Sequence, residues 1–206
     1  MSGKDVHRQT ASIIFQKEPA EVTKLERQDA KEFTFAPIFG GMGMAYAPHI
    51  RAYFQKFFEI YAGVKNWHDH LQNEAVRTGK VRTFTGREYA FPYAKRNKWG
   101  SVSQSTQIKN WPVQGTATGD VVPCAFIALS RAMRKAGLQS LPINTVHDSI
   151  VVDVYPGEED ACIDLMRKIM SNVNQEVERR YNYVMRMPLA IEMKLGDNWL
   201  DGKEFK

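Results

Sequence analysis

The sequence has few cysteines and no long apolar run, and each scarcity excludes a class of protein. Its 206 residues contain two cysteines, Cys124 and Cys162, too few and too far apart for the disulfide framework of a small secreted domain. The longest apolar run, residues 121–129, contains Pro123 and is far shorter than the roughly 20 apolar residues that span a membrane. We therefore expect neither a disulfide scaffold nor a membrane-spanning helix.

The sequence also shows no internal repeat and no low-complexity stretch. Its first residues, Met-Ser-Gly-Lys-Asp-Val-His, lack the apolar stretch of a secretory signal. Together with the isolated cysteines, this favours a reducing cytoplasm. Hydrophobic residues make up 43% and mixed charged residues 25%, values typical of a folded domain rather than a disordered chain.

The chain carries a modest excess of positive charge. It has 28 Lys and Arg against 23 Asp and Glu, a formal net charge of +5 that is compatible with a polyanionic partner. Many basic proteins bind no nucleic acid, so this excess alone does not identify the partner. Residues 95–98, Lys-Arg-Asn-Lys, are predicted to form a basic loop.

The spacing of apolar residues predicts a mixture of helices and short strands. Spacings of three and four indicate helices, whereas alternation around a glycine or a polar turn indicates a hairpin. Pro112 is expected to separate two helices at a rigid corner. We expect helices over 27–39 (ended by Gly40 and Gly41), 101–109, 114–135 and 158–181, a helical pair over 49–78 broken at Gly63, hairpins over 81–91 and 143–154, and a strand over 189–193.

Arg27 and Lys31 are the first candidates for a binding site. They lie four residues apart on one side of a predicted helix, where like charges repel by about 0.2–0.5 kcal/mol. A polyphosphate would offset this repulsion, because Arg clamps phosphate oxygens and Lys adds a point charge. Phe35, one turn further along, would offer a flat apolar face to a sugar or base. A solvated basic face beside a buried Phe explains the same spacing and is the alternative.

Asp148 is the candidate metal ligand. It is expected at the tip of the hairpin over 143–154, where apolar residues on both strands would hold its carboxylate rigidly. Mg²⁺ prefers such oxygen ligands, although an Asp-Ser pair is also ordinary turn chemistry. Two-metal phosphoryl transfer needs a second carboxylate nearby, and Asp153 is the nearest in sequence.

Two further groups of polar residues have both a functional and a structural explanation. Asn110 and Gln114 flank Pro112, and their amides could hydrogen-bond bases or sugars, but a helix cap and turn explains the same composition. His68 and His70 lie two residues apart on a predicted helix and so point in different directions. We expect them to be ordinary core or surface histidines rather than metal ligands.

Five segments in order resemble motifs of family A DNA polymerases, the family of bacterial DNA polymerase I and related phage replicases. The resemblance covers nearly the whole chain. Asp5-Val-His7 precedes a segment similar to the fingers motif of Arg, Lys, an aromatic residue and Tyr-Gly, here Arg27-Gln-Asp-Ala-Lys31, Phe35, Phe39 and Gly40. The remaining segments resemble a Gln-Gly-Thr-Ala motif, the palm hairpin and the C-terminal ending: Gln114-Gly-Thr-Ala117, Val146-His-Asp148 and Gly196-Asp-Asn-Trp199.

The resemblance implies a role for each matching residue. Arg27 and Lys31 would bind the triphosphate of an incoming dNTP and act in catalysis, with His7 near its phosphates and Phe35 against its sugar. Asp148 would be a catalytic ligand of Mg²⁺. The residues implied to lie at the nascent base pair or to contact primer–template DNA are Phe39, Gly40, Asn110, Gln114 and His147.

Several residues depart from the family pattern. Ser149 stands where a Glu usually follows the palm Asp, and Phe39 replaces the Tyr, which keeps a stacking surface without its hydroxyl. Pro37 lies inside the predicted fingers helix and should bend its last turn, as in a similar phage branch of the family. Residues 114–120 look one residue longer than the common pattern.

The resemblance implies an α+β fold that is an incomplete polymerase right hand. Residues 1–110 would be the helical fingers with a small hairpin, and residues 111–206 the C-terminal part of a palm with an antiparallel sheet. The family's other catalytic Asp, the thumb and any exonuclease domain would belong to an upstream fragment or subunit. We therefore expect a DNA-directed DNA polymerase part that needs this partner and is inactive alone.

Two other readings of the sequence stay open. A polymerase relic that holds DNA or nucleotide without catalysis would keep the basic surface and the aromatic residues, and Asp148→Ala would leave its activities unchanged. A basic α+β domain of unrelated function would require all five motif matches to be coincidental.

Overall fold

The computed structural model describes residues 5–41, 47–186 and 189–205. Contacts divide the chain into two compact units, Met1–Arg82 with Glu88–Pro112, and Thr83–Arg87 with Val113–Lys206. Helices with three small antiparallel sheets confirm the predicted α+β class. Within the described residues, no helix is long and apolar enough to cross a membrane.

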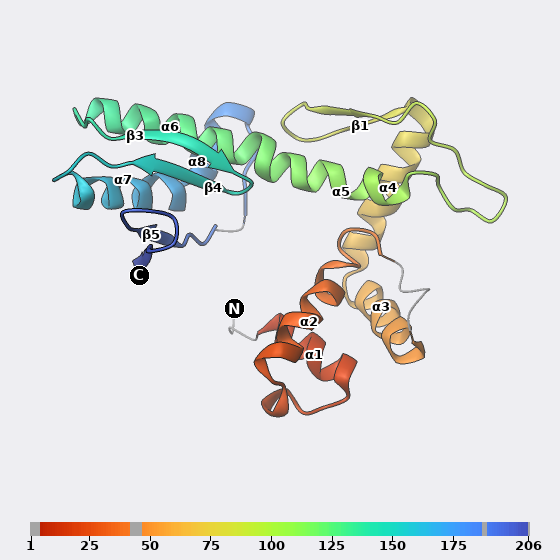
Figure 1. Ribbon diagram of the computed structural model, residues 1–206. Helices are drawn as coiled ribbons and strands as arrows, with labels where there is room; N and C mark the ends of the chain where they lie inside the picture. Colours follow the sequence, from red (N-terminus) through yellow and green to blue (C-terminus); the bar gives the residue numbers. More distant parts are fainter. Residues whose placement is uncertain (1–4, 42–46, 187–188, 206) are drawn as a thin grey trace. The chain divides into compact units, whose positions relative to one another are not determined.

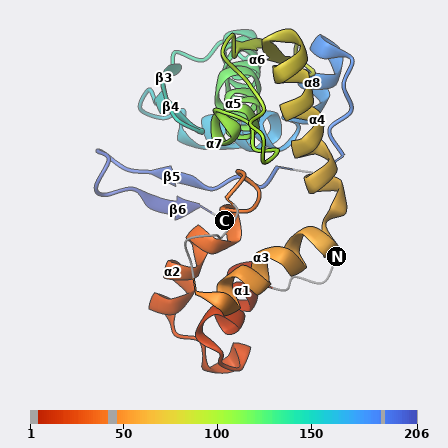
Figure 2. The ribbon, with the colours of Figure 1, turned by 90° about the vertical axis from the view of Figure 1, so that its right-hand side faces the viewer.

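The first unit begins with a helical region. Its helices are α1 (Val6–Phe15), the short 3₁₀ helix η1 (Pro19–Glu21), α2 (Lys24–Phe35), α3 (Pro48–Ile60) and α4 (Ala62–Thr78). The start of α2 is a capping box, in which Thr23 accepts from the Glu26 backbone N–H and Glu26 accepts from the Thr23 N–H. An ion pair with Lys17, together with these bonds, lowers the pKa of Glu26 to about 2. Helix α1 packs against α2 and α3, as Figures 1 and 2 show.

Two helix ends in this unit differ from the expectation. Helix α2 begins before Arg27 and ends at Phe35 instead of residue 39. Pro37 has no N–H to continue the helical ladder, so the chain leaves it in a turn that reaches Gly40 at φ 90°. Helices α3 and α4 separate at Tyr61 (φ −105°, ψ 52°), whereas Gly63 lies inside α4.

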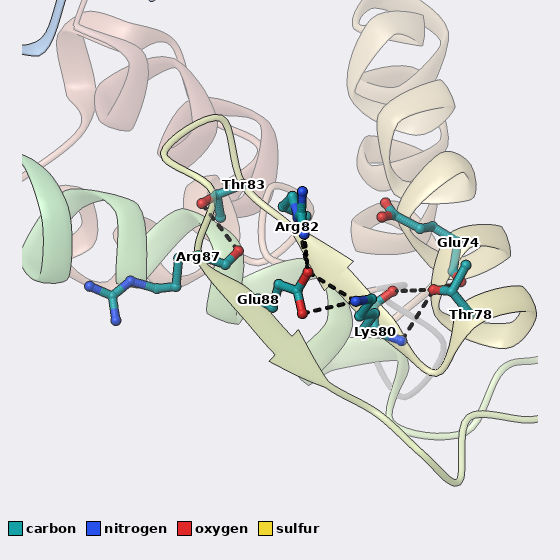
Figure 3. A network of polar contacts seen from close by, with 7 residues as sticks. All are labelled: Glu74, Thr78, Lys80, Arg82, Thr83, Arg87 and Glu88. Carbon is teal, nitrogen blue, oxygen red and sulfur yellow. Dashed lines mark hydrogen bonds and ion pairs between the residues drawn. The ribbon is translucent and has the colours of Figure 1, made fainter. Parts of the chain in front are cut away.

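The predicted first hairpin is present as β1 (Lys80–Arg82) and β2 (Glu88–Ala90). Its strands are joined by an ionic cluster in which Glu88 accepts from Lys80 at 2.9 Å and from Arg82. Figure 3 shows this cluster and the Thr78 hydroxyl, which lies 2.8 Å from the Lys80 carbonyl oxygen. The core beneath comes from α4, the hairpin, the segment between β2 and the next helix, and that helix, α5 (Ser105–Thr116): Leu71, Ala75, Val81, Phe91, Ala94, Val102 and Ile108.

The predicted corner at Pro112 is wrong. Helix α5 (Ser105–Thr116) continues through Pro112, which costs one backbone hydrogen bond and leaves the proline buried. A π-helical turn, η2 (Ala117–Val121), follows and leads into α6 (Val122–Lys135). A π turn holds one more residue than an α turn, so it accommodates the extra residue expected between 114 and 120.

The second predicted hairpin is also present, as β3 (Leu141–Val146) and β4 (Ser149–Asp153). Val146 pairs with Ser149, so His147 and Asp148 form the tip, and His147 adopts a left-handed conformation with φ 54°. Helix α6 packs against β3 and against α7 and α8. The core of this unit centres on α6: Val121, Cys124, Ala125, Leu129, Met133, Ile150, Cys162, Val173 and Val177.

The C-terminal elements differ from the expectation in two places. The helix predicted over 158–181 is two helices, α7 (Glu159–Ser171) and α8 (Val173–Tyr181), because Asn172 leaves helical geometry and its side chain donates to the Lys168 carbonyl at 2.8 Å. The strand predicted over 189–193 lies later, as β5 (Met193–Leu195), where β6 (Lys203–Phe205) supplies its pairing partner.

Candidate functional site

Arg27 lies on α2 and is held by the N-cap of α1. Asp5 caps α1 by accepting from the Arg8 backbone N–H at 3.1 Å, and its other oxygen accepts from Arg27 Nε at 2.6 Å. The Arg27 hydrogen bond is the main reason that the pKa of Asp5 lies below its usual value. The two terminal amino groups of Arg27 make no hydrogen bond to a described residue, so they are available to a ligand.

Lys31 lies one turn beyond Arg27 on the same helix. Its side chain is half-buried and forms no ion pair with any residue that the structure describes. Asp5 offsets the positive charge of Arg27 but no described carboxylate does so for Lys31. The like-charge repulsion inferred from the sequence is therefore only partly relieved within the chain.

Three aromatic side chains meet at the C-terminal end of α2. His7 and Phe35 pack edge to face with ring centroids 5.3 Å apart, and Phe35 lies 6.3 Å from Phe39. Phe35 is 44% exposed, so the predicted buried-Phe alternative is wrong and an apolar face is open to solvent. The buried Nδ1 atom of His7 has no hydrogen-bond partner within the described chain, which leaves a polar atom to be satisfied by a ligand or solvent.

Gly40 lies in the turn that follows α2 and is buried against Lys109 of α5. A Cβ at residue 40 would lie 2.5 Å from Lys109 Cδ, and the backbone φ of 90° also favours glycine. Lys109 is only 4% exposed, and burial lowers its pKa while the charge of Asp69 opposes that shift. Beside it, buried His68 donates from Nε2 to the Ile38 carbonyl at 2.8 Å, a structural role that confirms the core-histidine expectation.

Asn110 and Gln114 lie on α5 but in different surroundings. Asn110 belongs to the first unit, and its Oδ1 is buried without a hydrogen-bond partner among the described residues. Gln114 belongs to the second unit and has an exposed side chain. Neither side chain caps the helix, so the predicted cap-and-turn alternative is wrong for both.

His147 and Asp148 are exposed at the tip of the β3–β4 hairpin. The Ser149 hydroxyl donates to the Val146 carbonyl at 2.8 Å and closes the turn. The carboxylate of Asp148 accepts no hydrogen bond from a described side chain or backbone group, which leaves its oxygens open to a cation. Asp153 lies at the far end of β4, opposite Leu141, and is too far along the strand to share a metal with the tip.

Among the described residues, Asp148 can supply one ligand to Mg²⁺, but a complete binding site for the ion is not present. No cluster of three or more His, Cys, Asp or Glu side chains within the described ranges is arranged to hold a metal ion. Asp148 supplies an oxygen ligand of the right chemistry, but a Mg²⁺ site in phosphoryl transfer uses further carboxylates.

An ion pair in the second unit, between the partly exposed Arg87 and the buried Asp120, was not predicted from the sequence. Asp120, on the π turn, is almost fully buried and accepts from Arg87 at 2.7 Å and from the Thr85 hydroxyl at 2.7 Å. Arg87 also donates to the Gly119 carbonyl at 3.0 Å. The partners are more than 30 residues apart, and neither lies in a recognisable short motif, so only the fold brings them together.

Comparisons with known proteins agree on one family. The family model described as "DNA polymerase family A" matches residues 1–201. DNA polymerase I of Aquifex aeolicus is 26% identical over 212 residues, covering 96% of this chain and 34% of that protein. The thermostable DNA polymerase I of Thermus thermophilus is 28% identical over 211 residues, covering 98% of this chain and 24% of its own length.

A solved structure shares the fold. The POL domain of Pol1 from M. smegmatis, in complex with DNA primer-template and dNTP, matches with a TM-score of 0.69 and 25% identity, over 84% of this chain and 32% of that one. The chain thus spans about a quarter to a third of the length of the relatives it matches. Because the family model covers almost every residue and the shared fold agrees with it, this chain belongs to DNA polymerase family A.

Proposed function

We propose that this chain is the fingers and C-terminal palm part of a DNA-directed DNA polymerase. Residues 1–110 would form the fingers and residues 111–206 the palm portion, with dNTP and primer–template DNA as partners. The observation that carries the proposal is the surface of α2, where Lys31 has no carboxylate partner among the described residues and the exposed Phe35 packs against His7, whose buried Nδ1 has no described hydrogen-bond partner. Family membership adds support.

The α2 surface would bind the incoming nucleotide. The free amino groups of Arg27 and the ammonium group of Lys31 would hold the triphosphate, with the His7 ring close to its oxygens. Phe35 would pack against the sugar, and Phe39 would lie beside the new base pair. Asp5 would keep the Arg27 side chain extended along α2 by holding its Nε.

The hairpin tip and α5 would face the primer–template. His147, Asn110, Gln114 and Gly40 would contact it, and the primer 3′ oxygen would attack the α-phosphate of the dNTP while pyrophosphate leaves. Asp148 would provide one ligand to Mg²⁺, which supplies charge stabilisation to the transferring phosphoryl group when it is bound. Since its substrate would be DNA, the chain would act in the cytoplasm, and in that of a bacterial host if a phage encodes it.

The polymerase activity would require an upstream fragment or subunit. The described residues supply one candidate metal ligand, and the relatives are three to four times longer than the matched region. The upstream part would bring the second carboxylate and the thumb. This chain alone would then bind nucleotide without extending a primer.

Nucleotide binding by the chain alone is the direct test. Titration with a dNTP, and separately with inorganic tripolyphosphate, should show binding that Arg27→Ala and Lys31→Ala each weaken by about 10-fold or more, as expected for a charge-assisted contact. Lys24→Ala, an exposed lysine at the start of the same helix, should leave the affinity nearly unchanged. Equal losses of affinity in all three variants would show that binding depends on general surface charge and not on a specific site.

A primer-extension assay then distinguishes the two hypotheses, a catalytic part of a polymerase and a non-catalytic relic. The chain is assayed with Mg²⁺ and primed template, alone and with a separately prepared upstream segment of the same polymerase. We expect extension only in the mixture and none with Asp148→Ala. A mixture that binds DNA and dNTP but extends no primer, with no effect of Asp148→Ala on either affinity, would favour the non-catalytic relic.

A further inference from the structure

The loop between β2 and α5, whose backbone leads into α5 in Figure 1, carries two exposed aromatic rings and several cationic residues. Tyr93 is 78% exposed and Trp99 is 77% exposed, more than any other aromatic side chain among the described residues. Lys95 and Lys98 lie between them, and Lys98 Nζ is 4.4 Å from the centroid of the Trp99 ring. A single exposed ring is ordinary, but two exposed rings on one loop beside two lysines form a clustered surface.

The loop is held in place by its own hydrogen bonds. The Asn97 side-chain oxygen accepts from the backbone N–H groups of Trp99 at 3.0 Å and Ser101 at 2.9 Å. The Ser103 hydroxyl accepts from the Lys95 N–H at 2.9 Å, and Arg96 donates to Asn73 of α4 at 2.6 Å. The exposed rings are therefore presented by an ordered turn, which lowers the entropy lost on binding a ligand.

The electrostatics of this segment favour an anion. Residues 89–119 contain no Asp or Glu, a stretch of 31 residues that includes the whole loop. Arg96 is engaged with Asn73 and the Gly100 carbonyl, whereas the ammonium groups of Lys95 and Lys98 have no hydrogen-bond partner among the described residues. Lys95 thus offers a free ammonium group, and Lys98 lies over one face of the Trp99 ring, which leaves the rest of that ring and the Tyr93 ring exposed to a base.

We propose that the loop of residues 93–99 binds single-stranded nucleic acid, with bases stacked on Trp99 and Tyr93 and phosphates on Lys95 and Lys98. Aromatic stacking platforms beside cations are the recognition mode for unpaired strands. A duplex keeps its base faces stacked inside, and an acidic peptide would use the lysines without the rings. This site is separate from the α2 nucleotide surface, and its binding does not depend on dNTP, Mg²⁺ or catalysis.

Fluorescence anisotropy with a labelled oligothymidylate of about 12 nucleotides tests the rings, using the full chain without dNTP or Mg²⁺. Trp99→Ala and Tyr93→Ala should each weaken binding by about fivefold or more, the low end for loss of base stacking, and Trp99→Phe should restore most of it. Trp199→Ala is the matched control, because Trp199 is 74% exposed but lies between Asp197 and Asp201. It should bind as the parent chain does.

The salt dependence tests the lysines. Each phosphate contact to a single strand adds about 0.7 to the slope of log K against log salt, so Lys95→Ala with Lys98→Ala should reduce that slope by about 1.4. Lys56→Ala, an exposed lysine on α3, should leave the slope unchanged.

Three results would overturn the proposal. The first is the absence of oligonucleotide binding by the parent chain, and the second is unchanged affinity in the ring variants. The third is equally strong competition by a blunt duplex or by polyglutamate, since neither offers unpaired bases to the rings. Because all substituted side chains are exposed, equal thermal midpoints by circular dichroism will show that the variants are folded.

Discussion

Gly40 shows at the scale of one residue how the fold restricts the sequence. Its φ of 90° and the closeness of Lys109 Cδ leave no room for a side chain. Gly40→Ala should therefore destabilise the chain by about 1–3 kcal/mol, combining left-handed strain with displacement of a buried lysine. Urea unfolding followed by circular dichroism measures this change.

Gly63 is the matched control for that substitution. It lies in α4, and a Cβ at this position would meet no atom within 4 Å. Gly63→Ala should be neutral or stabilise by up to about 1 kcal/mol, because alanine loses less backbone entropy in a helix. Equal effects at residues 40 and 63 would contradict the steric explanation for Gly40.

His68 should make stability depend on pH. Burial lowers the pKa of its imidazole, so the unfolded chain binds this proton more readily than the folded chain does. The stabilisation is fully present above the unfolded pKa of about 6.5 and is lost as the pH falls towards the folded-state pKa. His68→Gln, which keeps an N–H donor for the Ile38 carbonyl, should reduce the fall in urea midpoint between about pH 7.5 and 5.

The control for His68 is its exposed neighbour two residues away. The side chain of His70 is 74% exposed and lies 3.9 Å from Glu74. His70→Gln should leave the pH dependence of the urea midpoint close to that of the parent chain. If both glutamine variants follow the parent curve, the buried imidazole is not the group that titrates.

At the scale of elements, one ion pair ties the loop between β1 and β2 to the π turn of the second unit. Asp120 is 6% exposed and Arg87 45%, so removing Arg87 leaves a nearly buried carboxylate with the Thr85 hydroxyl as its remaining hydrogen-bond partner among the described residues. Arg87→Met should destabilise the chain by about 1–3 kcal/mol, below the full cost of a wholly buried pair because Arg87 is partly solvated. Thermal or urea unfolding measures the difference.

Arg82, on the same hairpin, provides the comparison for Arg87. Its side chain is 62% exposed and pairs with Glu88 on the surface. Arg82→Met should change stability by less than about 1 kcal/mol, as surface ion pairs usually do. A loss at residue 82 as large as that at residue 87 would show that burial of Asp120 is not the cause.

At the scale of the whole molecule, Mg²⁺ should bind this chain only weakly. Asp148 is an exposed single carboxylate, and no second ligand accompanies it in the described residues. Addition of about 10 mM Mg²⁺ should therefore leave the thermal midpoint nearly unchanged, because ligand-induced stabilisation requires concentrations well above Kd. An upward shift that Asp148→Ala abolishes would show instead that this chain completes a metal site.

The sequence alone determined the family, the α+β class and the positions of the two hairpins with Asp148 at a tip. These features depend on local signals: ordered short motifs, residue spacing, and turn chemistry around Thr85-Gly86 and His147-Asp148. It did not determine the helix ends at Phe35, Tyr61 and Asn172. Several possible helix ends are nearly equal in energy, and capping and tertiary packing decide between them. The spacing of residues in the sequence does not contain those energies.

Only the tertiary structure decided which side chains meet. It brought Asp5 to Arg27, His7 to Phe35, and Arg87 to Asp120, pairs separated by 22 to 33 residues. It also carried α5 through Pro112, where burial of the proline and of Ile108 one turn earlier offsets one missing hydrogen bond. Contacts between distant segments depend on how helices pack in three dimensions, and that information becomes available only when the whole chain has folded.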